Sequence, residues 1–224
     1  MTENSIALLN SHEKELRRYV ALLASYEGKI RLTGPTDPEI LWKEHIMDCL
    51  ASLPYLPESG EVLDAGSGGG LPGLVWAICR PDLQVTLIDS VRKKCGALEE
   101  MKNALQLNNI SVVCARCEVY AKERREEYSL AAARALAATD LLLEYLAPFV
   151  MHSGCILAFK GPQYKDEISP LSGKWSALGL GAPEIFAYST NEKERFFLLW
   201  RKEAPTPSRF PRKIGIAEKN KWWR

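Results

Sequence analysis

The stretch VLDAGSGGGLPG, residues 62–73, decides the fold of this chain. A short apolar run ends in an acid, Asp64, and five glycines follow it. Glycine is used where the backbone turns tightly or lies close to a ligand. From Gly68 the spacing is G-x-G-x-x-G, typical of dinucleotide-binding loops; from Asp64 it is D-x-G-x-G-x-G, which indicates a nucleoside without a pyrophosphate. The stretch therefore predicts a strand, a ligand-binding loop and a helix at the start of an α/β sheet.

Strand-like and helical runs alternate after this loop. A strand at 61–65 and a helix at 72–80 are followed by further pairs, which predict a parallel sheet with helices on both faces. Two strand-like runs, 183–189 and 195–202, are joined by the polar turn TNEKE and predict a closing hairpin. We expect a Rossmann-like α/β fold, with the seven-stranded, mostly parallel sheet and antiparallel last strand of nucleoside-dependent methyltransferases. The other expected strands are 84–89, 110–116, 128–134 and 154–161, and the other expected helices are 91–107 and 138–150.

Two further segments flank this core. Residues 5–26 repeat apolar side chains at helical spacing, and a second helix is expected from Asp37-Pro38 to about Leu53. From Pro205 the chain holds six Lys and Arg against one Glu, and its three prolines argue against a helix in the first half of this stretch. We predict three parts: a helical extension at 1–56, a Rossmann-like core at 57–203 and a basic tail at 204–224.

The composition is that of an ordinary globular protein, with 46% apolar residues and a formal net charge of +1. The first residues lack the apolar run of a signal peptide, and no run approaches the roughly 18 residues of a membrane span. The six cysteines are scattered, and the lone pair Cys114-x-x-Cys117 is poor support for a metal site. We expect a cytoplasmic protein with reduced cysteines and no metal or membrane contact, and a monomer.

Two acids at strand ends indicate the ligand. Asp89 ends the second expected strand, where a carboxylate accepts the ribose hydroxyls of NAD or S-adenosylmethionine, although it could instead cap the next helix. Asp64 lies beside the loop, where a carboxylate repels a pyrophosphate and tolerates an ammonium group. The two acids together favour S-adenosylmethionine over a dinucleotide, with Gly66 and Gly68 in the binding loop.

The ends of the third and fourth strands add candidates. Cys117 and Glu118 are expected to border the adenine, whose exocyclic amine a carboxylate could bind; the alternative for Glu118 is a surface acid at a helix start. Arg134 follows an apolar run, so its charge needs a partner. It either clamps the ligand or pairs with Asp64 or Glu118.

Outside the strands, His45 and Asp48 lie three residues apart on one helix face, and a structural hydrogen bond is favoured over a metal site or a general base. Lys160 ends a strand at the ligand edge, where it contacts a substrate phosphate or is solvated. Basic residues near both ends of the chain form a candidate RNA-binding face, although such runs are more often solvated. The candidate RNA contacts are Arg31, His45, Lys93, Lys160, Arg212 and Lys213.

Several motifs in order resemble one known family. EHIMDCL, EVLDAGSGGGLPG, VTLIDSVRKK, AARALA, FKG and PRKIG are similar to those of the bacterial small-subunit ribosomal RNA methyltransferase G family, also called glucose-inhibited division protein B. The similarity runs from about Lys29 to Gly215. It implies S-adenosylmethionine bound by Gly66, Leu71, Cys117, Glu118 and Arg134. Departures are Arg31, Cys49 and Leu136, where the family usually has Asn, Ser and Phe.

The resemblance also implies a reaction, methyl transfer to N7 of one guanine in 16S rRNA, either free or in a small-subunit particle. N7 carries a lone pair on a neutral ring, so no general base is needed and the enzyme acts by positioning. Three alternatives stay open: a methyltransferase of a small molecule or protein, a dinucleotide-dependent reductase, and a non-catalytic RNA-binding protein on the same fold.

Overall fold

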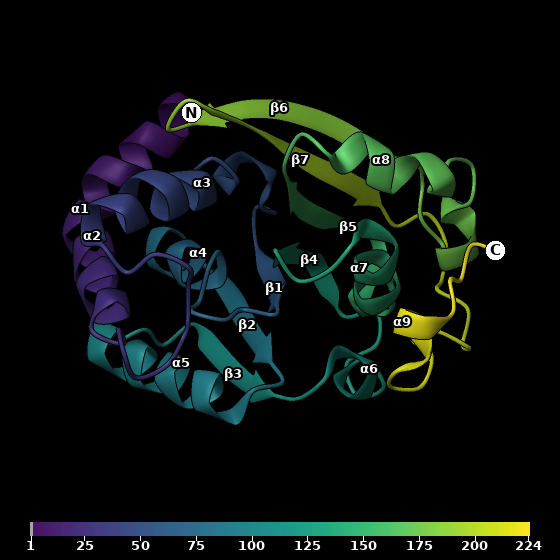
Figure 1. Cartoon of the computed structure of the whole chain (residues 1–224), viewed down its shortest axis with the longest axis horizontal. Helices are drawn as coiled ribbons and strands as arrows, with labels where there is room; N and C mark the ends of the chain where they lie inside the picture. Colours follow the sequence, from purple (N-terminus) through teal and green to yellow (C-terminus); the bar gives the residue numbers. More distant parts are fainter. Residues whose placement is uncertain (1) are drawn as a thin grey trace.

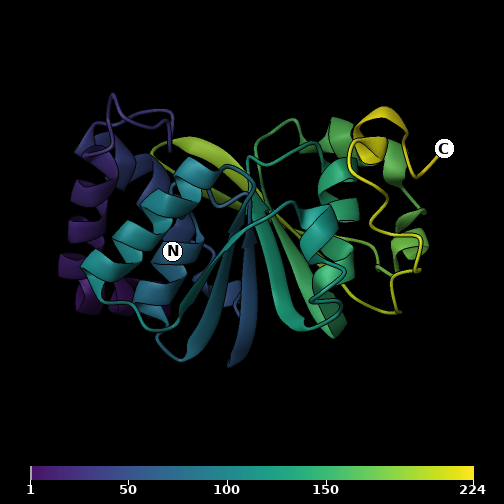
Figure 2. The ribbon, with the colours of Figure 1, turned by 90° about the horizontal axis from the view of Figure 1, so that it is seen from below.

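The computed structural model describes residues 2–224 and shows a central sheet between two layers of helices (Figures 1 and 2). The strand order is β3-β2-β1-β4-β5-β7-β6. Neighbouring strands are parallel except at β7, which runs antiparallel to both β5 and β6. The predicted seven-stranded sheet with one antiparallel strand is therefore confirmed. The strands are β1 Gly60–Ala65, β2 Leu83–Asp89, β3 Ile110–Cys114, β4 Tyr128–Arg134, β5 Val150–Lys160, β6 Glu184–Thr190 and β7 Lys193–Arg201.

The helices divide between the two faces of the sheet. Helices α1, α4 and α5 cover one face, and α7 and α8 cover the other, with the C-terminal segment outside them (Figure 2). The helix expected at 37–53 is interrupted by a π-helical turn at Leu41–Ile46. The helices are α1 Glu3–Ala24, α2 Pro38–Ile40, α3 Met47–Leu50, α4 Gly73–Cys79, α5 Arg92–Leu105, α6 Cys117–Tyr120, α7 Thr139–Leu146, α8 Tyr164–Ile168 and α9 Ile216–Lys219.

Each face of the sheet has its own apolar core. Side chains alternate along a strand, so Val62 belongs to the cluster under α1, α4 and α5, while the next residue, Leu63, belongs to the cluster under α7. Both side chains are fully buried. The near-continuous apolar runs in the sequence follow from this burial on two sides.

The closing hairpin has the turn that its sequence predicts. Thr190 pairs with Lys193 across a two-residue loop, and both loop residues, Asn191 and Glu192, have positive φ (49° and 61°). Such turns match the twist of the flanking strands, and Asn tolerates this backbone conformation well. The hairpin adds β7 beside β5 and so widens the sheet behind the ends of β4 and β5.

The N-terminal extension packs directly on the glycine loop. Leu16, Tyr19 and Leu23 of α1 join the core cluster that also contains α4 and α5. The buried Tyr19 hydroxyl donates to the carbonyl of Gly69 at 2.8 Å. The loop backbone is thus held by Tyr19, a residue of the helical extension and not of the predicted core. The predicted boundaries of the three parts, at residues 56 and 203, stay a prediction.

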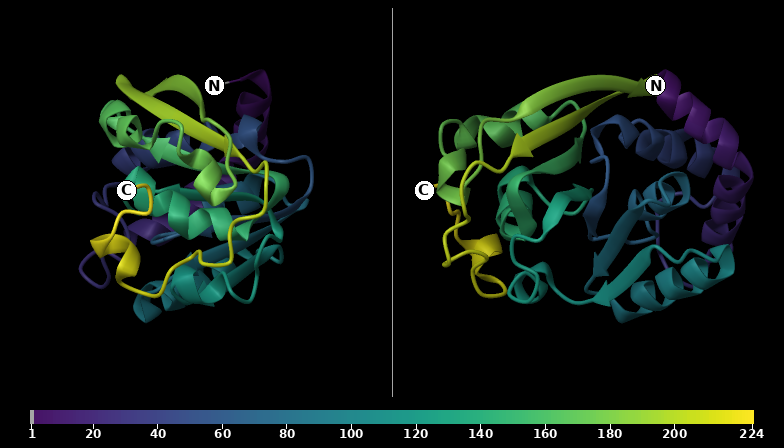
Figure 3. Two further views of the ribbon diagram at one scale, coloured as in Figure 1. Left: turned by 90° about the vertical axis from the view of Figure 1, so that its right-hand side faces the viewer. Right: turned by 180° about the vertical axis from the view of Figure 1, so that it is seen from behind.

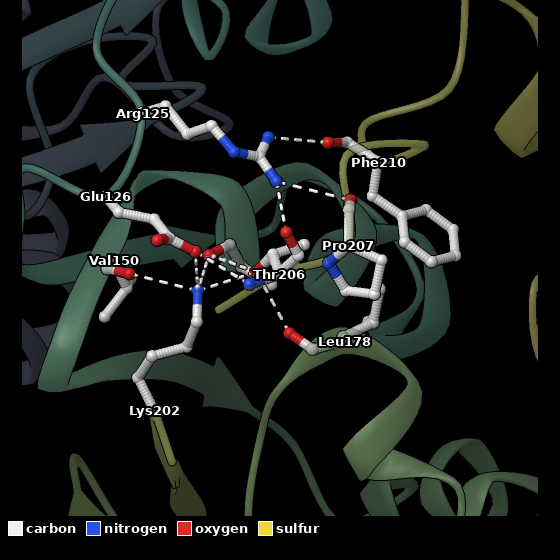
Figure 4. Close-up of polar contacts among 9 residues, drawn as sticks. Arg125, Glu126, Val150, Leu178, Lys202, Thr206, Pro207 and Phe210 are labelled. Atoms are coloured by element: carbon white, nitrogen blue, oxygen red, sulfur yellow. Dashed lines mark hydrogen bonds and ion pairs between the residues drawn. The ribbon is translucent and has the colours of Figure 1, made fainter. Parts of the chain in front are cut away.

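The C-terminal segment lies against the α7 side of the molecule, at the end opposite α1 (Figure 3). Arg125 donates to the carbonyls of Thr206, Pro207 and Phe210 (Figure 4). Nearby, the buried ammonium of Lys202 donates to Thr206 Oγ1 at 2.6 Å. Only α9 is helical after Pro205, as the prolines of this segment indicate. The segment is therefore docked through its backbone, and not only through its charges.

No helix among residues 2–224 has the length and apolar character needed to cross a membrane. In the same part of the chain, no three His, Cys, Asp or Glu side chains gather in a way that would hold a metal ion. The six cysteines are free thiols, of which Cys114 is exposed.

Candidate active site

Three adjoining hollows lie at the carboxyl ends of the central strands. The β2–β3 hollow (about 270 Å³) is bordered by Asp89 and Glu118. The loop hollow (about 460 Å³) lies over Gly66–Gly69, and the β4–β5 hollow (about 600 Å³) lies over Phe159 and Lys160. Ala135 borders all three. The hollows therefore adjoin one another around Ala135, at the edge where parallel sheets bind their ligands, and we refer to them together as the groove.

The β2–β3 hollow contains the acids predicted there. Asp89 Oδ2 accepts from Gly68 N at 3.1 Å, and Oδ1 accepts from Val91 N at 2.9 Å. The N-cap of α5 is Val91, which makes no side-chain capping bond, so Asp89 does not cap the helix. It fixes the turn before α5 and holds the glycine loop, while its side chain still borders the hollow. Glu118 is 3% exposed, and its Oε1 has no hydrogen-bond partner among the described residues. A buried acceptor without a donor at a hollow wall is a place for a ligand N–H.

The loop hollow is shaped by glycine backbone. Gly66 has φ +70°, and a Cβ on it would lie 2.6 Å from Cδ1 of Leu136. A side chain here would strain the turn and collide with Leu136, which borders the β2–β3 and β4–β5 hollows. Gly68 and the buried Leu71 also border this hollow, opposite the segment Arg31–Gly34. Gly66, Gly68 and Leu71 thus lie where the sequence places them, at the groove floor.

Asp64 lies beneath the loop. Its side chain is fully buried and does not border the three hollows, which corrects the expectation that it faces the ligand. Asp64 Oδ2 accepts from Gly73 N at 3.0 Å, and its carbonyl accepts from the Ser67 hydroxyl at 2.8 Å. The side chain of Asp64 fixes the start of α4, because a helix N-terminus attracts a carboxylate. Its carbonyl fixes the turn of the glycine loop at Ser67.

Burial raises the pKa of Asp64 from 3.8 to about 7. Between these values the folded state keeps a proton that the unfolded state has released, so stability falls as the pH rises. Asp64→Asn removes this titration. We expect the free energy of unfolding of the wild type, relative to the variant, to decrease from about pH 4 to about pH 7 and then level off. Urea unfolding of both proteins between about pH 4 and about pH 7 measures this difference in the free energy of unfolding. Parallel pH dependences for the two proteins would contradict the raised pKa of Asp64.

Arg134 joins β4 to the N-terminal extension. Its guanidinium donates to Asp48 Oδ2 and to His45 Nδ1, each at 2.8 Å. Asp48 Oδ1 in turn accepts from the Tyr188 hydroxyl at 2.6 Å. The sequence-based hypothesis that Arg134 forms an ion pair with Asp64 or Glu118 is therefore wrong, because Arg134 forms its ion pair with Asp48. The structural hydrogen bond favoured for His45 and Asp48 agrees with these contacts to Arg134. His45 as an RNA contact stays a prediction.

The β4–β5 hollow is lined by charges of both signs. Lys160 Nζ bonds to Glu167 Oε2 at 2.6 Å and to the carbonyl of Ala137 at 3.2 Å. Lys160 is therefore held in an ion pair and is not solvated, while its contact with a substrate phosphate stays a prediction. Arg195 and Tyr188 line the hollow from the closing hairpin.

The other basic candidates fall into two groups. Arg31, Lys93 and Lys213 are exposed, and Arg31 borders the loop hollow. Arg212, in contrast, bonds to both carboxylate oxygens of Glu144, which is fully buried. This bond corrects the prediction of Arg212 as an RNA contact. The expected single basic face is also divided, because α1 and the tail lie at opposite ends of the molecule (Figure 3).

Among the groove residues that sequence reasoning missed are Ala135, Tyr188 and Arg195. Ala135 has φ +56°, unusual for a residue with a side chain, and it lies where all three hollows meet. Its sequence carries no sign of this conformation. Tyr188 and Arg195 lie on adjacent strands of the hairpin and pair in register, so only the sheet topology brings them to the site.

Comparisons with known proteins show the family to which the sequence is similar. The family described as rRNA small subunit methyltransferase G matches residues 12–196. The Ribosomal RNA small subunit methyltransferase G of Pseudothermotoga lettingae is 35% identical over 220 residues, covering 97% of this chain and 95% of that protein. The protein of that name from Moorella thermoacetica is 34% identical over 210 residues, covering 91% and 88%.

Among solved structures, a 16S rRNA (adenine(1408)-N(1))-methyltransferase variant from Catenulisporales acidiphilia is similar in fold. It aligns with a TM-score of 0.55 at 14% identity, over 71% of this chain and 90% of that one. At that identity the similarity concerns the fold alone.

Proposed function

This chain belongs to the rRNA small subunit methyltransferase G family, and we propose that it transfers the methyl group of S-adenosylmethionine to N7 of one guanine in 16S rRNA. The observation that carries the proposal is the set of three adjoining hollows at the carboxyl ends of the central strands, all bordered by Ala135. The two smaller hollows suit an extended cofactor, and the largest of the three suits a base presented beside it.

The residues of the groove fit the cofactor by their chemistry. The unpartnered Oε1 of Glu118 accepts the exocyclic amine of an adenine, with Cys117 beside it in the wall. Asp89 accepts the ribose hydroxyls, and the curled backbone at Gly66, Gly68 and Leu71 accommodates the remainder. Arg134, at the junction with the β4–β5 hollow, provides the positive charge for a carboxylate. When bound, S-adenosylmethionine supplies an activated methyl group on sulfur.

The protein's contribution to the reaction is positioning. Guanine N7 attacks through its own lone pair, so the groove needs no base to remove a proton. Holding the reacting atoms in line at about 3 Å, away from water, provides on the order of 7–11 kcal/mol of barrier reduction. Positive charge moves from the cofactor to the purine, and Glu44, Asp48 and Glu167 around the β4–β5 hollow keep a cation tolerable there.

We further propose that the protein acts in the cytoplasm as a monomer, on 16S rRNA either free or in a small-subunit particle. The exposed Arg31 borders the loop hollow, where it would contact a phosphate, and the exposed Lys93 at the start of α5 is a second candidate. Lys213 is exposed on the docked tail.

The test is methyl transfer from radiolabelled S-adenosylmethionine to purified 16S rRNA, to 30S particles and to a metabolite and protein extract. Label should enter the RNA or particles, and cleavage at N7-methylguanine should map it to one nucleotide. Label in the extract alone would support a different substrate class. Binding to 16S rRNA without transfer would identify a non-catalytic protein, and thermal stabilisation by NAD(P) instead of S-adenosylhomocysteine would identify a reductase.

Asp89→Ala is expected to weaken S-adenosylhomocysteine binding tenfold or more, because the ribose loses its acceptors. Calorimetry measures the affinity. Asp89→Asn is the matched control, since it retains one acceptor and the side-chain size, and it should lose less. Unchanged affinity in Asp89→Ala would remove Asp89 from the cofactor site, and unfolding curves report whether loss of the Gly68 and Val91 bonds has loosened the loop instead.

A further inference from the structure

His45 carries a polar atom that the rest of the molecule leaves unused. Its Nε2 is buried and has no hydrogen-bond partner among the described residues. The side chain borders both the loop hollow and the β4–β5 hollow. Buried polar nitrogen atoms in folded proteins almost always have partners. An exception at the junction of two ligand hollows therefore points to a partner that arrives with the ligand.

The network behind His45 fixes which nitrogen carries the proton. Arg134 has donors only, so His45 Nδ1, at 2.8 Å from its guanidinium, must be the acceptor and must lack a proton. The neutral ring then carries its proton on Nε2. Burial and the neighbouring Arg134 lower the pKa of His45 to about 4. At neutral pH the side chain is an uncharged Nε2–H donor, held in place by Arg134, Asp48 and Tyr188.

An uncharged donor at this position suits one edge of the acceptor base. Guanine presents two adjacent acceptors, N7 and O6, whereas adenine presents N7 beside an amine donor. A base whose N7 faces the methyl group necessarily directs its six-position substituent to the neighbouring wall. A cofactor carboxylate, in contrast, is better matched by the guanidinium of Arg134, which borders the same two hollows as His45.

Resting on the proposed function, we propose that His45 Nε2–H donates to O6 of the acceptor guanine and selects guanine over adenine. His45 is then a specificity-determining residue, which orients the N7 edge without taking part in proton transfer. Adenine would bring an N–H donor against another donor and leave both unpaired. A neutral ring also adds no charge beside a purine that becomes cationic.

Two variants separate the donor from the rest of the side chain. His45→Asn can keep an acceptor near Nδ1 for Arg134 but has no group at Nε2. His45→Gln can place an N–H near Nε2 and should rescue. The substrates are 16S rRNA with guanine, or with 2-aminopurine, which has N7 but no O6, at the methylated position. Single-turnover methyl transfer gives the rates, and calorimetry with S-adenosylhomocysteine gives cofactor affinity.

The wild type is expected to prefer guanine over 2-aminopurine about tenfold, His45→Asn to lose most of that preference, and His45→Gln to retain part of it. The N1–H that 2-aminopurine also lacks is absent for every protein and cancels in the comparison. An unchanged preference in His45→Asn would overturn the proposal, as would weaker S-adenosylhomocysteine binding that accounts for the whole loss of rate. If the wild type methylated no guanine in 16S rRNA, the proposed function itself would fail. That result is distinct from the two outcomes that would overturn the role of His45.

Discussion

Arg212→Ala is expected to lower the free energy of unfolding by about 3–5 kcal/mol. The guanidinium donates to Glu144 at 2.7 Å through Nε and at 2.5 Å through Nη2, and Glu144 is 0% exposed in the last turn of α7. The hydrogen bonds with Glu144 raise the pKa of Arg212, so the pair favours the charged guanidinium. Removing the arginine leaves a buried carboxylate without its cation, which is the costly way to break an ion pair.

Urea unfolding measures this loss of stability. Two control variants show whether it comes from the ion pair with Glu144. Lys213→Ala removes the neighbouring, exposed cation and should change stability by less than about 0.5 kcal/mol. The double variant Arg212→Met with Glu144→Leu removes both charges and should recover much of the loss, because well-packed apolar pairs can replace buried ion pairs. If Arg212→Ala behaved like Lys213→Ala, the tail would not be docked in solution and Arg212 would again be available to RNA.

The tail shows where sequence reasoning stops. Its composition indicates a nucleic-acid contact, yet two of its six cations form ion pairs within the molecule. Lys221 pairs with Asp140 at 2.5 Å, and Arg212 pairs with Glu144 across 68 residues of sequence. The sequence DLLLEYL, residues 140–146, indicates that Glu144 could be buried, because this acid follows three leucines, and a buried acid needs a partner. The sequence does not indicate which of the many cations of the chain is that partner.

The fold itself follows from local patterns. The glycine loop after β1, Asp89 at the end of β2 and the hairpin turn at Asn191 all depend on neighbours along the chain, and each lies where the sequence predicts it. Arg134 could be identified as a residue needing a partner for the same reason. Its partner Asp48 is 86 residues away on α3, and only the packing of the extension against the sheet brings them together.

Arg134→Lys is expected to reduce methyl transfer to 16S rRNA about 100-fold. A lysine keeps the charge, but its single ammonium cannot reproduce the planar guanidinium that bonds to Asp48 and His45 together. The side chain is largely buried at the junction of the two hollows that we assign to cofactor and base. A displacement of about 1 Å between reacting groups is sufficient for a loss of this size. Arg201→Lys, an exposed arginine paired with Glu184 at the far end of β7, is the matched control and should retain its rate.

Asp48→Asn then divides the effect of Arg134 into its two parts. The amide keeps the shape of Asp48 but weakens its bond to Arg134, so it disturbs the link between the extension and β4 while the guanidinium stays in the groove. If Arg134 contacts the cofactor carboxylate, Arg134→Lys should weaken S-adenosylhomocysteine binding several-fold more than Asp48→Asn does. If its role is only to hold the extension, the two variants should lose rate together with cofactor affinity unchanged in both. Wild-type rates in Arg134→Lys would remove Arg134 from the site, and would also remove the support on which the orientation of His45 depends.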